Sequence, residues 1–300
     1  MADYFRPMLA ARESPASYPL FFKQLTYPMV VSPKYDGIRG IPRNGVVLSR
    51  TGKPLPSTQV QREFGSLLPF DGEFIEGNPT DEDVYHRTES HVMSANKPGD
   101  IHFYVFDFTD ESMLLKPFFE RLECAESLLP KDSKLHLVPH IYVDNEAQLL
   151  EHEQKCLQQG FEGVMMRSPF APYKNNRSTF LQGWLLKLKR FEDAEGVLLD
   201  ILEGHNNHNE LKYDELGFAK RSDSKENKTP SGMAGQYIVD FNGLELIVAP
   251  GHFKHHERIE HLKNKSQYIG RLLKFRYFNR GVKDLPRFPR AVGFRDKMDV

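Results

Sequence analysis

The sequence predicts an α+β protein of two domains, with mainly antiparallel sheets and flanking helices in residues 1–190 and a small β-barrel in residues 191–300. Three observations support this prediction. The length of 300 residues is enough for two domains of ordinary size, and 39% hydrophobic with 27% charged residues is typical of a globular chain. Strand-like and helix-like segments alternate in the first part, whereas short strand-like runs dominate the second.

A hairpin signal lies at 38–50, just after Val30, Val31 and a polar loop. Asn44 and Gly45 separate two apolar runs there, and this dipeptide favours a two-residue hairpin turn. Aromatic and β-branched residues indicate further strands, and helix formers at helical spacing indicate helices. The predicted strands are 70–75, 101–108, 160–167 and 184–190, and the predicted helices are 111–129 and 146–159.

The last of these strands carries two lysines. Lys187 and Lys189 alternate with Leu186 and Leu188. Side chains of a strand point alternately to opposite faces, so both lysines share one face. That face is either a binding surface or an exposed edge.

The second domain has five strand-like runs and one helical stretch in about 110 residues. Asn242 and Gly243 form a tight hairpin turn between two of the runs. This pattern favours a five-stranded barrel of the OB type, with a sandwich as the alternative. The predicted strands are 196–202, 237–241, 244–248, 272–278 and 290–294, and the predicted helix is 255–264.

A polar segment, residues 204–232, lies between the first two predicted strands of this domain. It is too long and too polar for an ordinary hairpin loop. Its composition favours disorder, and a loop that orders on a partner is the alternative.

Cysteine content and apolar runs exclude several classes of protein. Cys124 and Cys156 cannot supply a four-thiolate zinc site, and we expect two reduced thiols. No apolar run approaches the roughly 20 residues of a membrane span, and the N-terminus lacks a signal-peptide pattern. We therefore expect a cytosolic monomer with no membrane partner.

Charge is distributed unevenly along the chain. Residues 251–300 carry 13 Lys and Arg against 5 Asp and Glu, although the whole chain has a net charge of −1. A basic segment beside an acidic remainder fits either contact with a polyanion or a solvated basic face.

Six short motifs follow one another in the first domain. Lys34 lies in the first, PKYDGIR, and SRTGKP (49–54), FDGEFI (70–75), YVFDF (104–108), FEGVMMR (161–167) and LLKLK (185–189) come after it. Taken singly, each has a plain structural alternative. Asp36 and Gly37 could form a solvated turn, Phe106 could belong to the core, and Glu73 and Glu162 could face water.

In order and spacing these motifs resemble the covalent nucleotidyltransferase superfamily of DNA ligases, RNA ligases and mRNA capping enzymes. The similarity is greatest to minimal ATP-dependent DNA ligases of the chlorella-virus type. It runs on through YKNNRSTFLQGWLLKLKRFEDAE, GFAKRS, SQYIGRLLKFRYF and KDLPRFPRAVGFR. The resemblance implies a nucleotidyltransferase domain at 1–190, an OB-fold domain at 191–300, ATP as the AMP donor and nicked duplex DNA as the partner.

The resemblance also implies a role for individual residues. Lys34 would carry AMP, Asp36 would lie by the reacting phosphate, and Glu162 would lie near the metal ion. The nucleotide would be bound by Arg39, Arg50, Glu73 (ribose), Phe106 (adenine stacking), Ser94 (adenine pocket), Lys187 and Lys189 (α-phosphate) and Arg295 (pyrophosphate). DNA would be contacted by Arg39, Arg50 and Arg177 at the 5′-phosphate and by Lys220 and Arg221 in a latch at 204–232, disordered when free.

The chemistry explains why these residue types occur together. A free lysine has a pKa of about 10.4, so little of it is nucleophilic at neutral pH. We expect Lys187, Lys189 and a bound Mg²⁺, or Mn²⁺ in its place, to lower that pKa and to stabilise the phosphoryl charge. Mg²⁺ keeps several waters, so few carboxylates are needed.

One motif departs from the family. Many members end in R-x-D-K, whereas Arg295, Asp296 and Lys297 are adjacent here. We therefore keep the expected role of Arg295 and assign no role to Asp296 or Lys297.

Three alternatives remain open from the sequence. An RNA ligase or a capping guanylyltransferase shares the lysine motif, and a non-catalytic nucleic-acid-binding relative would share the fold. The retained Lys34, Glu73, Glu162, Lys187 and Lys189 argue against the last. Dependence on NAD⁺ is disfavoured, because the NAD⁺-dependent ligases use a four-cysteine zinc module.

Overall fold

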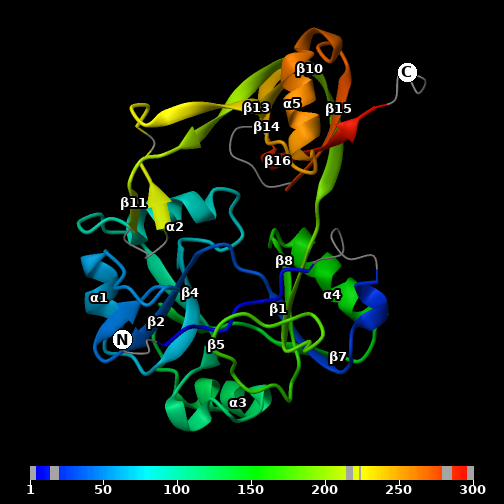
Figure 1. The fold of residues 1–300 in the computed structure, drawn as a ribbon. Coiled ribbons are helices and arrows are strands. Elements are labelled where there is room, and N and C mark those ends of the chain that lie inside the picture. The colour runs from blue at the N-terminus through cyan, green and yellow to red at the C-terminus, as the bar shows by residue number, and fades with distance from the viewer. Residues whose placement is uncertain (1–4, 14–19, 214–218, 223, 279–285, 296–300) are drawn as a thin grey trace. The chain divides into compact units, whose positions relative to one another are not determined.

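A computed structural model describes residues 5–13, 20–213, 219–222, 224–278 and 286–295 (Figure 1). The chain divides into two compact units. The first comprises Met1–Arg190 with Tyr213–Phe218, and the second comprises Phe191–Lys212 with Ala219–Val300. Each unit is described by itself below.

Two sheets form the first unit. The five-stranded sheet has the order β3-β2-β4-β5-β6, and the four-stranded sheet has the order β7-β1-β8-β9. Their pairs are antiparallel apart from β5 with β6. The strands are β1 Met29–Pro33, β2 Ile38–Arg43, β3 Val46–Leu48, β4 Phe70–Glu76, β5 Ile101–Phe108, β6 Leu135–Leu137, β7 Ile141–Val143, β8 Gly163–Arg167 and β9 Leu185–Lys189.

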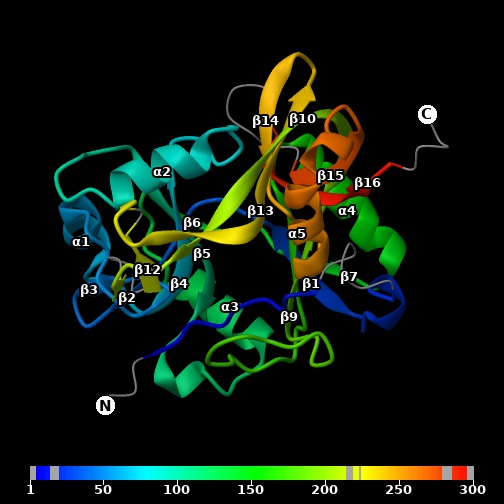
Figure 2. The same cartoon turned by 45° about the horizontal axis from the view of Figure 1, so that its top comes forward.

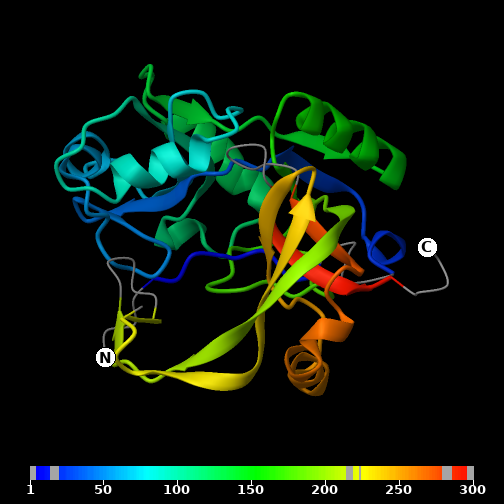
Figure 3. The same ribbon diagram turned by 90° about the horizontal axis from the view of Figure 1, so that it is seen from above.

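Helices bury one face of each sheet. Residues of α1, α2 and α3 pack with the five-stranded sheet around Phe74 and Phe103. Residues of α4 pack with the four-stranded sheet around Val31 and Leu188. Figure 3 shows α4 along its own sheet. The helices are α1 Thr58–Phe64, α2 Val84–Val92, α3 Phe118–Leu128 and α4 Glu146–Gln158, with 3₁₀ turns at Phe22–Gln24 and Glu111–Met113.

The first predicted hairpin is confirmed. Asn44 and Gly45 have φ angles of 52° and 80° between β2 and β3, the left-handed values that this turn requires. Two predicted segments begin later than expected. Gly160, with φ of 93°, ends α4, so β8 starts at Gly163. Pro117 precedes α3, because proline fits a helix start but not its interior.

Two helices in this unit were not predicted. α1 is a short, mostly polar helix whose start is capped by the Ser57 hydroxyl, which accepts from the Val60 N–H at 3.3 Å. α2 likewise buries little beyond Val84, Thr88 and Val92. Helices this short present too few apolar positions for periodicity to detect.

The second unit has a five-stranded antiparallel sheet of order β14-β13-β10-β15-β16 around a core that includes Tyr237 and Phe275. The predicted strands and helix are confirmed. They are β10 Glu192–Asn207, β13 Lys228–Phe241, β14 Leu244–Val248, β15 Leu272–Phe278, β16 Arg287–Phe294 and α5 His255–Lys263, with a 3₁₀ turn η3 at Lys265–Gln267. β14 and β16 are the outer strands of this sheet. Within the described residues, one parallel bridge, between Ala249 and Arg290, connects the end of β14 to β16.

The described residues of the insertion at 204–232 lie largely in strands, and residues 214–218 and 223 lie outside the described part of the chain. β10 and β13 continue past the domain core as a paired ribbon, with pairs such as Asn206 with Thr229 (Figure 2). Beyond them, β11 (Leu211–Tyr213) pairs with β12 (Ala219–Arg221). The Asn209 side-chain amide donates to the carbonyls of Ser222 and Ser224 at 2.9 and 2.8 Å. The composition favoured disorder, whereas polar side chains among the described residues bond to backbone carbonyls.

Both cysteine thiols are free, as predicted. Cys124 is half-buried and Cys156 is fully buried. No helix in the described part of the chain has the length and apolar character that a bilayer crossing requires.

Candidate active site

The local backbone fixes where Lys34 lies. Lys34 follows β1 directly, and its backbone N–H donates to the Gly163 carbonyl at 2.9 Å. Gly163 has a φ of 149°, and a Cβ there would lie 2.2 Å from the Leu188 carbonyl oxygen. Only glycine allows this close approach of the two strands. The approach brings together Lys34, Glu162 and the end of β9.

A buried carboxylate bridges two lysines at that point. Glu162 accepts from the Nζ atoms of Lys34 and Lys189, one on each carboxylate oxygen. The Glu162 side chain is 9% exposed. Burial raises the pKa of Glu162, but Lys34 and Lys189 outweigh it and lower the pKa to about 2.

Lys34 has a raised pKa in this arrangement. Burial acts to lower the pKa of Lys34, but the charges of Glu162, Asp36 and Glu73 act to raise it and prevail. The prediction that neighbouring cations lower it is therefore wrong for the protein alone, because three carboxylates surround this ammonium group. Burial does lower the pKa of Lys187 and of Lys189, with Lys34 contributing to both.

A cavity of about 260 Å³ lies beside Lys34. Its lining includes residues from β1, β2, β4, β5, β8 and β9. The predicted site residues among them are Lys34, Arg39, Arg50, Glu73, Phe106, Arg177 and Lys187. Apolar neighbours are Leu9, Val30, Val138, Met165 and Leu185. A cavity with apolar walls and a few converging charged groups suits a small anionic ligand with a planar ring.

Strand alternation explains why Phe106 lines the cavity. In β5, Phe103 and Val105 are buried, whereas Tyr104 and Phe106 are half-buried on the other face. The Arg39 guanidinium lies 5.2 Å from the centre of the Phe106 ring. Phe106 is thus a cavity residue rather than a core residue.

Glu73 lies directly opposite Arg39 in the pairing of β4 with β2. Burial raises the pKa of Glu73 to about 7, although Lys34 and Arg39 act against the rise. A carboxyl with this pKa is part protonated at neutral pH and can donate as well as accept a hydrogen bond.

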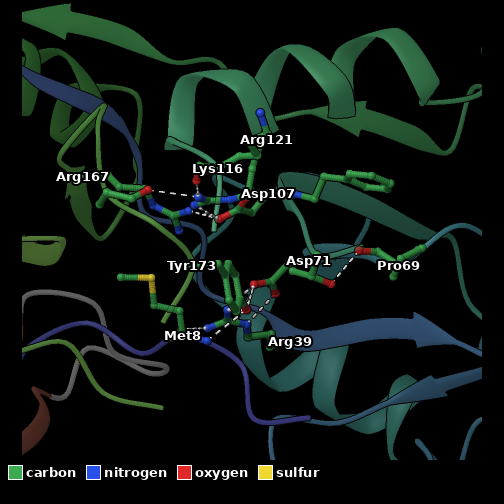
Figure 4. A network of polar contacts seen from close by, with 12 residues as sticks. Met8, Arg39, Pro69, Asp71, Asp107, Lys116, Arg121, Arg167 and Tyr173 are labelled. Atoms are coloured by element: carbon green, nitrogen blue, oxygen red, sulfur yellow. Dashed lines mark hydrogen bonds and ion pairs between the residues drawn. The ribbon is translucent and has the colours of Figure 1, made fainter. Parts of the chain in front are cut away.

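Two buried ion-pair networks support the cavity wall, and both appear in Figure 4. In the first, Asp71 accepts from Arg39 through both carboxylate oxygens. In the second, Asp107 accepts from Arg121, at 2.8 and 3.1 Å, and from Arg167. Arg121 also donates to the carbonyls of Lys116 and Ala171 at 2.6 and 3.0 Å. Buried charges paired in this way are fixed in orientation.

Sequence reasoning missed Asp71, Asp107, Arg121 and Arg167 as structural partners, together with Tyr173. Asp71, Asp107 and Arg167 stand inside the quoted motifs FDGEFI, YVFDF and FEGVMMR. The signal was therefore available: charged residues in strands that are otherwise apolar are rarely buried without a partner.

Ser94 lies away from this cavity, and Lys220, Arg221 and Arg295 belong to the second unit, which is described by itself. Ser94 follows α2, its N–H donates to the His91 carbonyl at 3.4 Å, and it is absent from the cavity lining. Arg295 donates to Glu195 at 2.8 Å in the second unit, and Arg221 donates to the Asn209 carbonyl. Lys220 lies on β12. Asp296 and Lys297 lie outside the described residues.

The residues present fit a weakly held Mg²⁺ ion. Among the described residues no group of three His, Cys, Asp or Glu side chains could hold a metal. Glu162 supplies one buried carboxylate beside Lys34, and Mg²⁺ bound through one carboxylate, waters and substrate phosphates needs no larger protein cage.

Comparison with known proteins gives matches over both units. The family described as "ATP dependent DNA ligase domain" matches residues 7–189, and the "DNA ligase OB-like domain" matches residues 227–295. A DNA ligase of Acidianus ambivalens is 29% identical over 222 residues, covering 66% of this chain and 36% of the relative. A DNA ligase of African swine fever virus is 25% identical over 305 residues, covering 93% and 66%. The chain thus spans between about a third and two thirds of these relatives' length.

Solved structures agree with these matches. The crystal structure of Chlorella virus DNA ligase-adenylate is 30% identical, with 98% of this chain and 99% of that chain covered and a TM-score of 0.53. A Lig E DNA ligase, at 21% identity and a TM-score of 0.70, shares the fold. Because the first family match spans more than half of the sequence, this chain belongs to the ATP-dependent DNA ligase family.

Proposed function

We propose that this protein seals nicks in duplex DNA, using ATP and a covalent AMP on Lys34. One observation carries the proposal: the Lys34 amine lies against Glu162 and Lys189 beside a cavity that also receives Lys187, Arg39 and Arg177. A nucleophilic amine among cations that can bind phosphate suits phosphoryl transfer, where positioning and charge do most of the work.

In the first step, the uncharged Nζ of Lys34 attacks the α-phosphorus of ATP. The P–N bond forms, the P–O bond to pyrophosphate breaks, and the amine proton leaves to solvent. Lys187 and Lys189 would stabilise the added negative charge on the α-phosphate. Glu162 would hold Lys34 in place before the reaction.

In the second step, an oxygen of the nick 5′-phosphate attacks the AMP phosphorus. The P–N bond breaks and Lys34 regains its proton. In the third step, the 3′-hydroxyl attacks the 5′-phosphorus, loses its proton and releases AMP. Arg39 and Arg177 would bind the 5′-phosphate during both steps, and Asp36 would lie by the reacting groups.

The nucleotide would bind along the same cavity. Phe106 would stack on adenine, Glu73 would bond the ribose, and Arg50 would contact phosphate. Arg295 would orient the pyrophosphate in the first step. The role of Ser94 in the adenine pocket stays a proposal that only the family resemblance supports.

Mg²⁺, held at Glu162 and by the ATP phosphates, would supply positive charge that offsets the carboxylates around Lys34. With that charge in place, the raised pKa of Lys34 would fall and the amine would become nucleophilic. Lys189, already within reach of Glu162, would contribute in the same direction.

We assign residues 1–190 to nucleotidyl transfer and residues 191–300 to an OB domain. The hairpin at 204–232 would be a DNA latch, with Lys220 and Arg221 on phosphates. Binding through phosphates would make the affinity for DNA fall as salt rises.

The test is self-adenylation followed by sealing. Incubated with labelled ATP, the protein should gain one AMP, which mass spectrometry should place on the peptide containing Lys34. Lys34→Ala should gain none, and Glu153→Gln, a buried carboxylate on α4 paired with Arg190, should behave as wild type. AMP on the Lys34→Ala variant would contradict the site assignment.

Substrate comparison separates the related activities. Label from GTP but not ATP would indicate a capping enzyme, and sealing of nicked RNA alone would indicate an RNA ligase. A wild-type protein that never gains AMP would indicate a binding protein without catalysis.

A further inference from the structure

Residues 6–11, here called the N-terminal segment, are built into the first unit by backbone bonds. The Leu9 N–H donates to the Asn176 carbonyl at 2.9 Å, and the Ser178 N–H donates back to the Leu9 carbonyl at 2.8 Å. The Ala11 N–H donates to the Leu185 carbonyl at 3.0 Å. The segment therefore runs between the Arg177 loop and β9.

Two carbonyls of this segment hold two arginines of the cavity. The Met8 carbonyl accepts from Nη1 of Arg39 at 2.8 Å, and the Ala10 carbonyl accepts from Nη1 of Arg177 at 2.6 Å. Carbonyls two residues apart on extended backbone point the same way. One short stretch of chain thus sets the spacing and direction of both guanidinium groups.

Tyr173 fixes the segment to Asp71, the other partner of Arg39. Its hydroxyl accepts from the Met8 N–H at 3.0 Å and donates to Asp71 Oδ2 at 2.6 Å (Figure 4). Tyr173 is 5% exposed and its ring stacks on Phe5 at 5.6 Å. The hydroxyl lies at the point where the segment, the carboxylate and the arginine meet.

We propose that the N-terminal segment, locked by the Tyr173 hydroxyl, orients Arg39 and Arg177 for the 5′-phosphate of the nick. Tyr173 is then a positioning residue for the steps that use that phosphate. The inference rests on the proposed ligase function. The Tyr173 hydroxyl contacts Met8, Asp71 and Arg39, whereas Glu162 holds Lys34 and Lys189, so transfer of AMP to Lys34 should not depend on Tyr173.

The experiment compares two nicks that differ at one group. Tyr173→Phe keeps the ring and removes the hydroxyl. The preference of the adenylated enzyme for a 5′-phosphate nick over a 5′-hydroxyl nick should fall by about tenfold, because the buried hydrogen bonds of the hydroxyl to the Met8 N–H and to the Asp71 carboxylate are lost. Binding of the 5′-hydroxyl nick and the rate of self-adenylation should stay within about twofold of wild type.

Tyr237→Phe is the matched control. Tyr237 is also a buried tyrosine whose hydroxyl has a partner, His261 Nδ1 at 2.8 Å, but it belongs to the core of the second unit. That variant should keep the phosphate preference. Should Tyr173→Phe not fold, Asp71→Asn, which weakens the same hold on Arg39, should show the same selective loss.

A double-mutant cycle tests the route of the effect. In a background that carries both Arg39→Ala and Arg177→Ala, Tyr173→Phe should cause no more than about twofold further loss of phosphate preference, since Tyr173 acts through those two arginines. Fully additive losses, an unchanged preference in the single variant, or equal losses of self-adenylation and phosphate preference would each overturn the inference. The proposed function fails separately, if wild type neither gains AMP on Lys34 nor seals a nick.

Discussion

At the residue scale, the most informative group is Glu162, because one carboxylate holds two amines. It keeps Lys34 in place, yet it also contributes to a raised pKa for the amine that must lose its proton. An ion pair of this kind is stable until another charge competes for the carboxylate. In the proposed mechanism, Lys34 would therefore stay charged and unreactive until the nucleotide and its metal arrive.

The raised pKa of Lys34 predicts an alkaline pH profile for self-adenylation. At low ATP the single-turnover rate should rise with pH, since this rate reports the free enzyme. Glu162→Gln removes one anion, so the profile should shift to lower pH even as the maximal rate falls. Glu153→Gln should leave its position unchanged. A profile that keeps its position in Glu162→Gln would contradict the assigned cause.

The buried pair network at Asp107 predicts a large stability effect. Asp107→Asn would leave Arg121 and Arg167 buried beside a neutral amide, at a cost of about 3–5 kcal/mol. Chemical denaturation measures this cost. Asp193→Asn, which alters an exposed pair with Arg276, should cost no more than about 1 kcal/mol. Equal losses of unfolding free energy in the two variants would show that burial of the Asp107 network does not contribute to stability.

The same carboxylate makes stability depend on acid. Burial raises the pKa of Asp107, but Arg167 and Arg121 outweigh it, so the folded pKa lies below the ordinary value of 3.8. Its contribution is present above pH 3.8 and is lost as pH falls below that value. The melting temperature of wild type should therefore drop more steeply there than that of Asp107→Asn.

At the element scale, the turn before β8 determines whether the site can form. Gly163 lets β8 and β9 approach while Lys34 bonds to its carbonyl. The two lysines of β9 then share a face, and Leu186 and Leu188 fill the core behind them, as alternation predicted. A single backbone conformation thus connects the core to the reacting amine.

Gly163→Ala should accordingly lower stability by about 1–3 kcal/mol and slow self-adenylation, because a side chain at φ 149° is strained and meets the Leu188 carbonyl. Thermal melts and single-turnover labelling measure the two effects. Gly293→Ala is the control, since nothing lies within 4 Å of a Cβ at that position. Wild-type behaviour of Gly163→Ala would refute the steric argument.

The inserted hairpin predicts a selective defect. His205 pairs with Pro230, so deletion of 206–229 joins neighbouring backbone and spares the domain core. Nick binding should weaken far more than self-adenylation. Gel-shift and AMP-labelling assays compare the two, and equal losses would argue against a DNA latch.

At the scale of the whole molecule, sequence reasoning succeeded where it depended on strand period and turn chemistry. The strands at Ile101–Phe108 and Leu244–Val248 were predicted to the residue, and both Asn-Gly turns were found. The cavity lining brought together Lys34, Glu73 and Phe106 from separate motifs.

Sequence reasoning failed where function depends on backbone or on summed charge. The backbone carbonyls of Met8 and Ala10 accept hydrogen bonds from two arginines of the cavity. Every residue has a carbonyl, so the residue types at positions 8 and 10 could not predict these contacts. The pKa of Lys34 depends on carboxylates from three places in the chain, and their distances follow only from the fold.

The charge of the whole chain predicts salt-sensitive DNA binding. The net charge of −1 offers no general attraction to DNA, so affinity must come from local cations. A plot of log affinity against log salt should be linear with a negative slope. Arg221→Ala should reduce that slope by about 1, whereas Arg62→Ala on α1 should not change it.

The parallel bridge between Ala249 and Arg290 has a consequence for solubility. It joins the residue after β14 to β16, the strand that also pairs with β15. A chain truncated before Arg287 would expose hydrogen-bonding groups along β15 and at Ala249, and exposed strand edges pair with those of other molecules. Such a truncated protein should self-associate, and a light-scattering measurement at increasing concentration would reveal the growth.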